Sequence, residues 1–225
     1  MSASSRMALT RVPAASATIE YASPKWGMFE FGLAYSTSSA TAQSDMGAAG
    51  AVNRKGDSWN FAPQLRGSNW DVGYSYWNAK FDQGTASDQR GDRLFGSYRF
   101  PQGFRISLAW DRSRLTNPAT GAKVSERRAW SIPLAYRTGP HTIQYTYSHA
   151  GTDDVIANAS ARMDSLAYQY ALSKRTQVGV TYSRINNDSG ANYNFFTGTA
   201  LGSADAAITA GEDPRILQFT VNHSF

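Results

Sequence analysis

Residues 94–110 read LFGSYRFPQGFRISLAW, and they carry a pattern that recurs along the chain. Two runs of alternating apolar and small or polar residues flank the turn-forming tripeptide Pro101-Gln102-Gly103. Alternation with a period of two is typical of a strand with two different faces, and a short Pro/Gly-rich connection joins antiparallel neighbours. The stretch therefore predicts a β-hairpin with one apolar and one polar face.

The same pattern continues in both directions and predicts eleven strands. Their connections alternate between short turns and long polar segments, and no segment longer than two turns has a helical period. The strands are expected at 17–23, 27–37, 58–66, 69–82, 91–100, 104–115, 125–137, 141–150, 160–172, 176–187 and 214–225. The long connections are expected at 38–57, 83–90, 116–124, 151–159 and 188–213.

The two faces of these strands differ sharply in charge. The apolar positions of ten strands number 37 and carry no charge, although at 17% charged residues about six would be expected by chance. A charge at the bilayer midplane of a barrel costs about 2–4 kcal/mol, which would produce this exclusion. The opposite face has small neutral residues such as Ser97, Ser107 and Gln144. A soluble β-sandwich is the alternative, but it would place more Lys and Glu there.

Aromatic residues gather at both ends of the expected strands, as in the interfacial belts of membrane barrels. One group lies near the short turns and comprises Trp26, Phe29, Trp70, Phe100, Phe104, Tyr136, Tyr170 and Phe225. The other lies near the long connections and comprises Tyr35, Trp59, Tyr76, Trp110, Tyr147 and Tyr182.

The composition excludes several classes of protein. The 225 residues are 41% hydrophobic and 13% aromatic, which is too apolar for a disordered chain. There is no cysteine, and no run of 18 apolar residues that would form a transmembrane helix. Residues 1–17 contain no export signal, so either the mature chain begins here or the true start lies upstream.

Three segments carry a family resemblance. The last residues, RILQFTVNHSF (215–225), resemble the C-terminal strand of Gram-negative outer-membrane proteins, and TIEYASPKWGMFEFGLAYS (18–36) and YALSKRTQVGVTYSRINN (170–187) are similar to segments of the trimeric general porins of β-proteobacteria. The resemblance implies an all-β, antiparallel transmembrane barrel in the bacterial outer membrane. It also implies a homotrimer that passes ions and small hydrophilic solutes without a cofactor, and recognition of Phe225 by the barrel assembly machinery.

The resemblance also implies missing strands. These porins have sixteen strands, so the eleven would be the sixth to the sixteenth, and residues 1–16 would be a remnant of the inward-folded third loop. Single-chain bacterial barrels have even strand numbers, so eleven strands suggest a fragment, with residues 17–225 supplying the barrel strands. The alternative is a twelve-stranded barrel in which residues 7–12 add a short strand.

Charged residues on the polar face are the candidate pore lining. Rings or ladders of charge give channels their selectivity, whereas cross-strand ion pairs would merely stiffen the wall; both interpretations stay open. The candidates are Glu20, Glu30, Arg66, Asp71, Arg99, Arg105, Asp111 and Arg127. Glu20 stands where the similar porins usually have Arg, which argues against strong anion preference, and the net charge of +5 supports only a mild one.

A second basic set lies near the long connections. It could bind lipopolysaccharide phosphates or simply be solvated, and it comprises Arg112, Arg114, Arg128, Arg162, Arg184 and Arg215.

The alternative functions are a barrel enzyme of lipase or protease type and an adhesin that displays its loops. The enzyme would depend on His149 with Asp153 and Asp154, because strand alternation turns His223 away from Asn222 and Ser224. No metal site is expected, because none of the three histidines falls in a metal-binding spacing. No nucleic-acid partner is expected, because the aromatic residues lie on the uncharged face.

Overall fold

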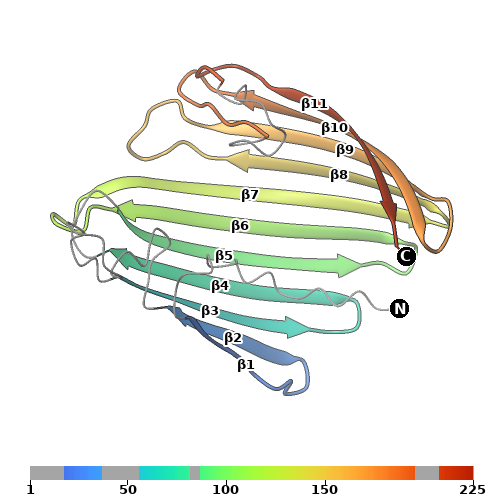
Figure 1. Ribbon diagram of the computed structural model, residues 1–225, viewed down its shortest axis with the longest axis horizontal. Helices are drawn as coiled ribbons and strands as arrows, with labels where there is room; N and C mark the ends of the chain where they lie inside the picture. The colour runs from blue at the N-terminus through green and yellow to red at the C-terminus, as the bar shows by residue number, and fades with distance from the viewer. Residues whose placement is uncertain (1–17, 37–55, 82–86, 196–207, 225) are drawn as a thin grey trace, which may run out of the picture.

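A computed structural model describes residues 18–36, 56–81, 87–195 and 208–224. Within these ranges the chain forms one antiparallel sheet whose eleven strands follow one another in sequence order, and Figure 1 shows them side by side in a curved sheet. The strands are β1 (Thr18–Ala22), β2 (Phe29–Ser36), β3 (Gly56–Arg66), β4 (Trp70–Phe81), β5 (Asp88–Arg99), β6 (Phe104–Thr116), β7 (Lys123–Thr138), β8 (His141–Ala150), β9 (Ala161–Ala171), β10 (Thr176–Asn187) and β11 (Arg215–His223). In the described ranges no helix is long and apolar enough to cross a membrane.

The strands lie where the alternation predicts them, and their ends differ by at most three residues. The largest difference is at residues 88–90, which were expected in a long connection and instead begin β5. They pair with Arg114, Leu115 and Thr116 because β6 extends far enough to offer them backbone partners. The possible short strand at residues 7–12 lies outside the described residues.

The register confirms that the sheet has two distinct faces, because directly paired residues point the same way. Leu94 pairs with Trp110, which pairs with Trp130, and these residues mark what we call the apolar face. Ser97 pairs with Ser107 on the opposite side, which we call the polar face.

The sheet is a single layer with little buried core. Large apolar residues of this face are widely exposed, from 36% for Trp110 to 76% for Phe219. An exposed apolar surface of this extent marks contact with a membrane or another protein rather than with water.

The turn between β5 and β6 depends on Gly103. Its φ is +90°, in the region that favours glycine, and the Phe100 carbonyl accepts a hydrogen bond from its N–H. A Cβ at this position would lie 2.3 Å from the carbonyl oxygen of Arg137. The Gly103 carbonyl also accepts a hydrogen bond from the Arg137 N–H, so the turn is fastened to β7.

Both lateral edges of the described sheet are open. β1 pairs only with β2 and β11 only with β10 among the described residues. The eleven strands therefore form an arc of a barrel and not a closed one.

Candidate functional site

The polar face is built from small side chains that hydrogen-bond across strands. Ser148 donates to Ser131 over 2.9 Å, and the hydroxyls of Ser165 and Ser183 are 2.7 Å apart. These hydroxyls satisfy one another, so this part of the face is compatible with water.

Near the short turns, the candidate charges form ion pairs on this face. Glu30 forms ion pairs with Arg66 at 3.6 Å and with Lys25 at 4.0 Å. Asp71 lies 4.0 Å from Arg105, and the Ser97 hydroxyl connects the two by accepting from Arg105 and donating to Asp71.

Two further candidates pair with residues that the sequence analysis did not select for the pore lining. Asp111 pairs at 2.5 Å with Arg93, which lies directly opposite on β5. Arg127 lies 3.8 Å from Asp153, which comes from the connection between β8 and β9. No motif in the sequence marked Asp153 as a partner of Arg127.

Asp153 is a buried carboxylate held by several donors. The Ser125 hydroxyl and the backbone N–H groups of Val155 and Ile156 donate to it. Burial raises the pKa of Asp153, but these hydrogen bonds and the nearby Arg127 charge outweigh burial and hold the pKa below its ordinary value.

Three arginines on the polar face lie together near the turn at Gly103. Arg99 is directly opposite Arg105, and Arg137 follows two residues after Ala135, which pairs with Arg105. Arg99 and Arg137 have no acidic partner within 4.0 Å in the described part of the chain. Glu20, the remaining candidate, lies on β1 opposite Ala34 and is exposed.

The apolar face carries charge at its long-connection end, where Glu126 collects four cations. Its side chain is 3% exposed and lies 2.5 Å from Arg112, 2.7 Å from Arg114, 3.2 Å from Lys123 and 3.9 Å from Arg128. Arg128 keeps 65% of its side chain exposed. The sequence analysis grouped these arginines but missed Glu126, the carboxylate that organises them.

The other three arginines of this basic set lie farther along the same end. Arg162 is opposite His149, and Arg184 lies between Asp164 and Arg215 in the register. Arg184 also pairs with Asp213 at 3.2 Å. We call this charged end of the apolar face, next to the long connections, the charged rim. The charge-free part of the apolar face is therefore a band between the charged rim and the short turns.

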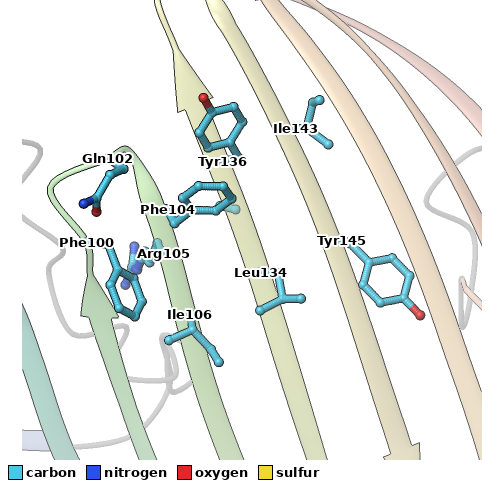
Figure 2. Close-up of a pocket in the computed structure, with 10 residues that line it drawn as sticks. Phe100, Gln102, Phe104, Arg105, Ile106, Leu134, Tyr136, Ile143 and Tyr145 are labelled. Carbon is cyan, nitrogen blue, oxygen red and sulfur yellow. The ribbon is translucent and has the colours of Figure 1, made fainter.

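At the opposite end, near the short turns, the apolar face has a shallow aromatic groove. Figure 2 shows Phe104, Ile106, Leu134, Tyr136 and Ile143 together on one side of β6 to β8, with Arg105 behind them. The rings of Phe104 and Tyr136 stack with centroids 4.3 Å apart. The groove belongs to one of the two aromatic belts that the sequence predicted.

The proposed enzyme residues do not assemble. His149 lies on the apolar face between Trp130 and Arg162, whereas Asp153 bonds to Ser125 and to its own loop. His223 lies opposite Thr176 and is 2.9 Å from its hydroxyl. Within the described ranges no three His, Asp or Glu side chains are grouped as a metal site.

An arc of long antiparallel strands, with a charge-free band on one face and a hydrogen-bonded polar wall on the other, is the architecture of an outer-membrane β-barrel protein. A family model described as Gram-negative porin matches residues 2–207. The chain therefore belongs to the Gram-negative porin family, whose members lie in the bacterial outer membrane.

Solved porin structures share the fold. A porin refined at 1.8 Å resolution is similar with a TM-score of 0.62 and 12% identity, and the alignment covers 93% of this chain and 61% of that one. OccK11 (OpdR) of Pseudomonas aeruginosa matches with a TM-score of 0.59, 13% identity and coverage of 93% and 71%. This chain thus spans about three fifths of the length of the first structure. A search of curated protein sequences found no significant match.

Proposed function

We propose that the protein forms a water-filled channel for passive diffusion of ions and small hydrophilic solutes, with a mild preference for anions. The contrast between the faces carries this proposal: exposed Leu, Phe and Val residues line one side, and hydrogen-bonded Ser and Gln residues line the other. The apolar face contacts lipid and the polar face lines the lumen. No cofactor or catalytic step takes part.

Conductance across a planar bilayer tests the channel. Protein extracted from native outer membranes is expected to give stepwise currents and to let small sugars swell liposomes. Lipase or protease activity without conductance would favour a barrel enzyme, and neither activity would favour a loop-display barrel.

The unpaired arginines of the polar face support the anion preference. Glu30, Asp71 and Asp111 are each matched by an arginine, so Arg99 and Arg137 supply surplus positive charge near the short turns. Of the candidate acids only the exposed Glu20 on β1 opposes this surplus. Arg99→Gln is expected to move the reversal potential in a salt gradient toward cations. The matched control is Arg128→Gln, which removes the same charge from the apolar face and should leave the reversal potential unchanged.

The charged rim supports binding of lipopolysaccharide phosphates, with the long connections outside the cell. Four cations surround Glu126, and although Lys123 also pairs with Asp154 at 2.9 Å, positive charge remains for an external anion. Arg128→Gln should reduce the thermal stabilisation that added lipopolysaccharide gives, and Arg99→Gln should not. Equal stabilisation by lipopolysaccharide that lacks phosphate would contradict the proposal.

A closed barrel requires strands beyond the eleven, because a bilayer does not tolerate unpaired strand edges. Five further strands and a loop, which would complete sixteen strands, would add about 12–14 kDa to the 24.6 kDa of this chain at ordinary strand lengths. The intact mass of the protein from native membranes tests this, and a mass of 24.6 kDa would contradict sixteen strands. We further propose a homotrimer for the complete protein and recognition of Phe225, which lies outside the described residues, by the assembly machinery.

A further inference from the structure

Residues 188–195, which follow β10, pack onto the polar face instead of extending away from the sheet. Ala191 is 2% exposed and packs with Ala161 of β9 and Ile185 of β10. Ile185 pairs with Met163, which pairs with Ser148, so the register places this cluster on the polar face. Tyr193 and Phe195 extend the cluster. A patch of apolar side chains therefore covers part of a wall that is otherwise small and polar.

Hydrogen bonds from the Asn187 side chain and from the backbone hold this segment against the sheet. The Asn187 side chain donates to the carbonyls of Tyr193 (2.9 Å) and Glu212 (2.6 Å) and accepts from the Tyr193 N–H (3.1 Å). The N–H of Asp188 donates to Ser160, and that of Gly190 donates to Asn158. The segment is thus fastened both to the end of β10 and to the connection before β9.

The segment reaches across the wall to a charged residue of a distant strand. The Tyr193 ring lies 5.1 Å from the guanidinium carbon of Arg127, which belongs to β7, three strands away from β10. The buried Asp153 forms an ion pair with the same guanidinium. The Arg127 Nε is buried and has no hydrogen-bond partner in the described residues. Burial raises the pKa of the Tyr193 phenol, so its ring stays neutral.

We propose that residues 188–195 form a constriction at the long-connection end of the channel, and that Tyr193 is a selectivity-determining residue because it covers Arg127. The proposal rests on the channel function proposed above. Residues 188–195 lie at the long-connection end of the strands, whereas the unpaired Arg99 and Arg137 lie at the short-turn end.

Two physical effects follow from the position of this segment. A second layer of chain on a sheet face occupies about 10 Å, which reduces the open cross-section of the lumen. The ring and Asp153 together keep permeating anions from direct contact with the guanidinium, because one covers its face and the other partly neutralises its charge.

Tyr193→Ala tests both effects in the native protein in planar bilayers. The expected results are a higher single-channel conductance and a reversal potential shifted toward anions, since water and anions gain access to Arg127. Tyr193→Phe keeps the ring and should behave as wild type. The matched control is Tyr182→Ala, which removes the same side chain from the apolar face of β10 and should change neither quantity.

A double-mutant cycle distinguishes the covered arginine from a general loosening of the segment. Arg127→Gln should shift the reversal potential toward cations more strongly in the Tyr193→Ala background than in wild type. Equal shifts in both backgrounds would show that Tyr193 does not cover Arg127 and would overturn the selectivity role.

A second approach does not rely on deleting the ring. Asn187→Ala removes three side-chain hydrogen bonds, two of which hold Tyr193, and should also raise the conductance. The chain has no cysteine, so Tyr193→Cys can be modified with positively or negatively charged methanethiosulfonates, which should shift the reversal potential in opposite directions. No shift in a folded, conducting channel would overturn the constriction. An absence of current in the wild type would instead refute the channel function itself.

Discussion

A charge placed in the centre of the apolar face should destabilise the protein in a membrane, and Leu108→Arg is the sharpest version of this test. Leu108 is 53% exposed and lies on β6 between the belt residues Phe104 and Trp110. The six-residue step between those rings covers about 20 Å along the strand. At a barrel tilt of about 40° this step spans about 15 Å of membrane height, so Leu108 lies inside the hydrocarbon.

The expected cost of Leu108→Arg is about 2–3 kcal/mol, because an arginine near the midplane costs about 2–4 kcal/mol and the cost falls toward the interfaces. The matched control is Ala109→Arg, since Ala109 pairs with Phe95 and Ser131 on the polar face and its side chain points into water. Ala109→Arg should cost less than about 1 kcal/mol, as expected for a solvated surface substitution.

Urea titration of the protein in lipid vesicles, followed by tryptophan fluorescence, measures both free energies of unfolding. Equal costs for the two variants, or a larger cost for Ala109→Arg, would refute the assignment of the apolar face to lipid. Such a result would mean that the exposed leucines and aromatics contact protein instead.

Three further predictions concern single sites. Gly103→Ala should cost about 1–3 kcal/mol, more than Gly121→Ala, because both glycines have positive φ but only Gly103 has a carbonyl in the way of a Cβ; urea titration of both variants would show equal costs if the contact with Arg137 were unimportant. Glu126→Gln should lower the free energy of unfolding by about 1–3 kcal/mol, because it removes the buried carboxylate that neutralises the surrounding cations. Asp111→Asn, in a solvated ion pair, should cost less than about 1 kcal/mol. Thermal melts of both variants in vesicles compare the two costs. The Asp153 carboxylate has a pKa below the ordinary 3.8, so its contribution to stability is complete above pH 3.8 and is lost as the pH falls through the lower, folded-state pKa; amide exchange of Val155 and Ile156, corrected for its intrinsic pH dependence, should stay constant above that pH and accelerate below it, and exchange that is unchanged at acid pH would contradict this assignment.

The strands and their faces could be predicted because both follow from local rules. Alternation identifies which face a residue belongs to, and each short turn fixes how its two strands align. Arg93 and Asp111 show how far this reasoning extends: both lie nine residues from Gln102, so the hairpin alone places them opposite each other. Their ion pair was therefore available from the sequence, although only Asp111 was selected as a candidate.

The ion pair of Arg127 with Asp153 could not be found in the same way. Asp153 belongs to a connection whose conformation depends on hydrogen bonds to Ser125 and to its own backbone, and no period or spacing encodes these. The inward packing of residues 188–195 has the same cause, because Asn187 directs the chain back over the sheet. Polar, glycine-containing segments are typical of external loops. The apolar residues that pack this segment onto the sheet, Ala191 and Tyr193, follow no period that the sequence would reveal.

The distribution of partners, more than the net charge of +5, determines the field inside such a channel. Most candidate charges of the polar face are neutralised at distances of 2.5–4.0 Å, so their fields largely cancel a few ångströms from the wall. Among the described residues of this face, what remains is the unpaired charge of Arg99 and Arg137 at one end, the exposed carboxylate of Glu20 at the β1 edge and the covered charge of Arg127 at the other end. An anion that enters from the long-connection end would therefore meet a weak field first and a strong one last, which predicts a current that differs between the two directions of applied voltage. Asymmetric current–voltage curves that become symmetric in the double variant Arg99→Gln/Arg137→Gln would support this order of charges, and curves that are symmetric in the wild type would contradict it.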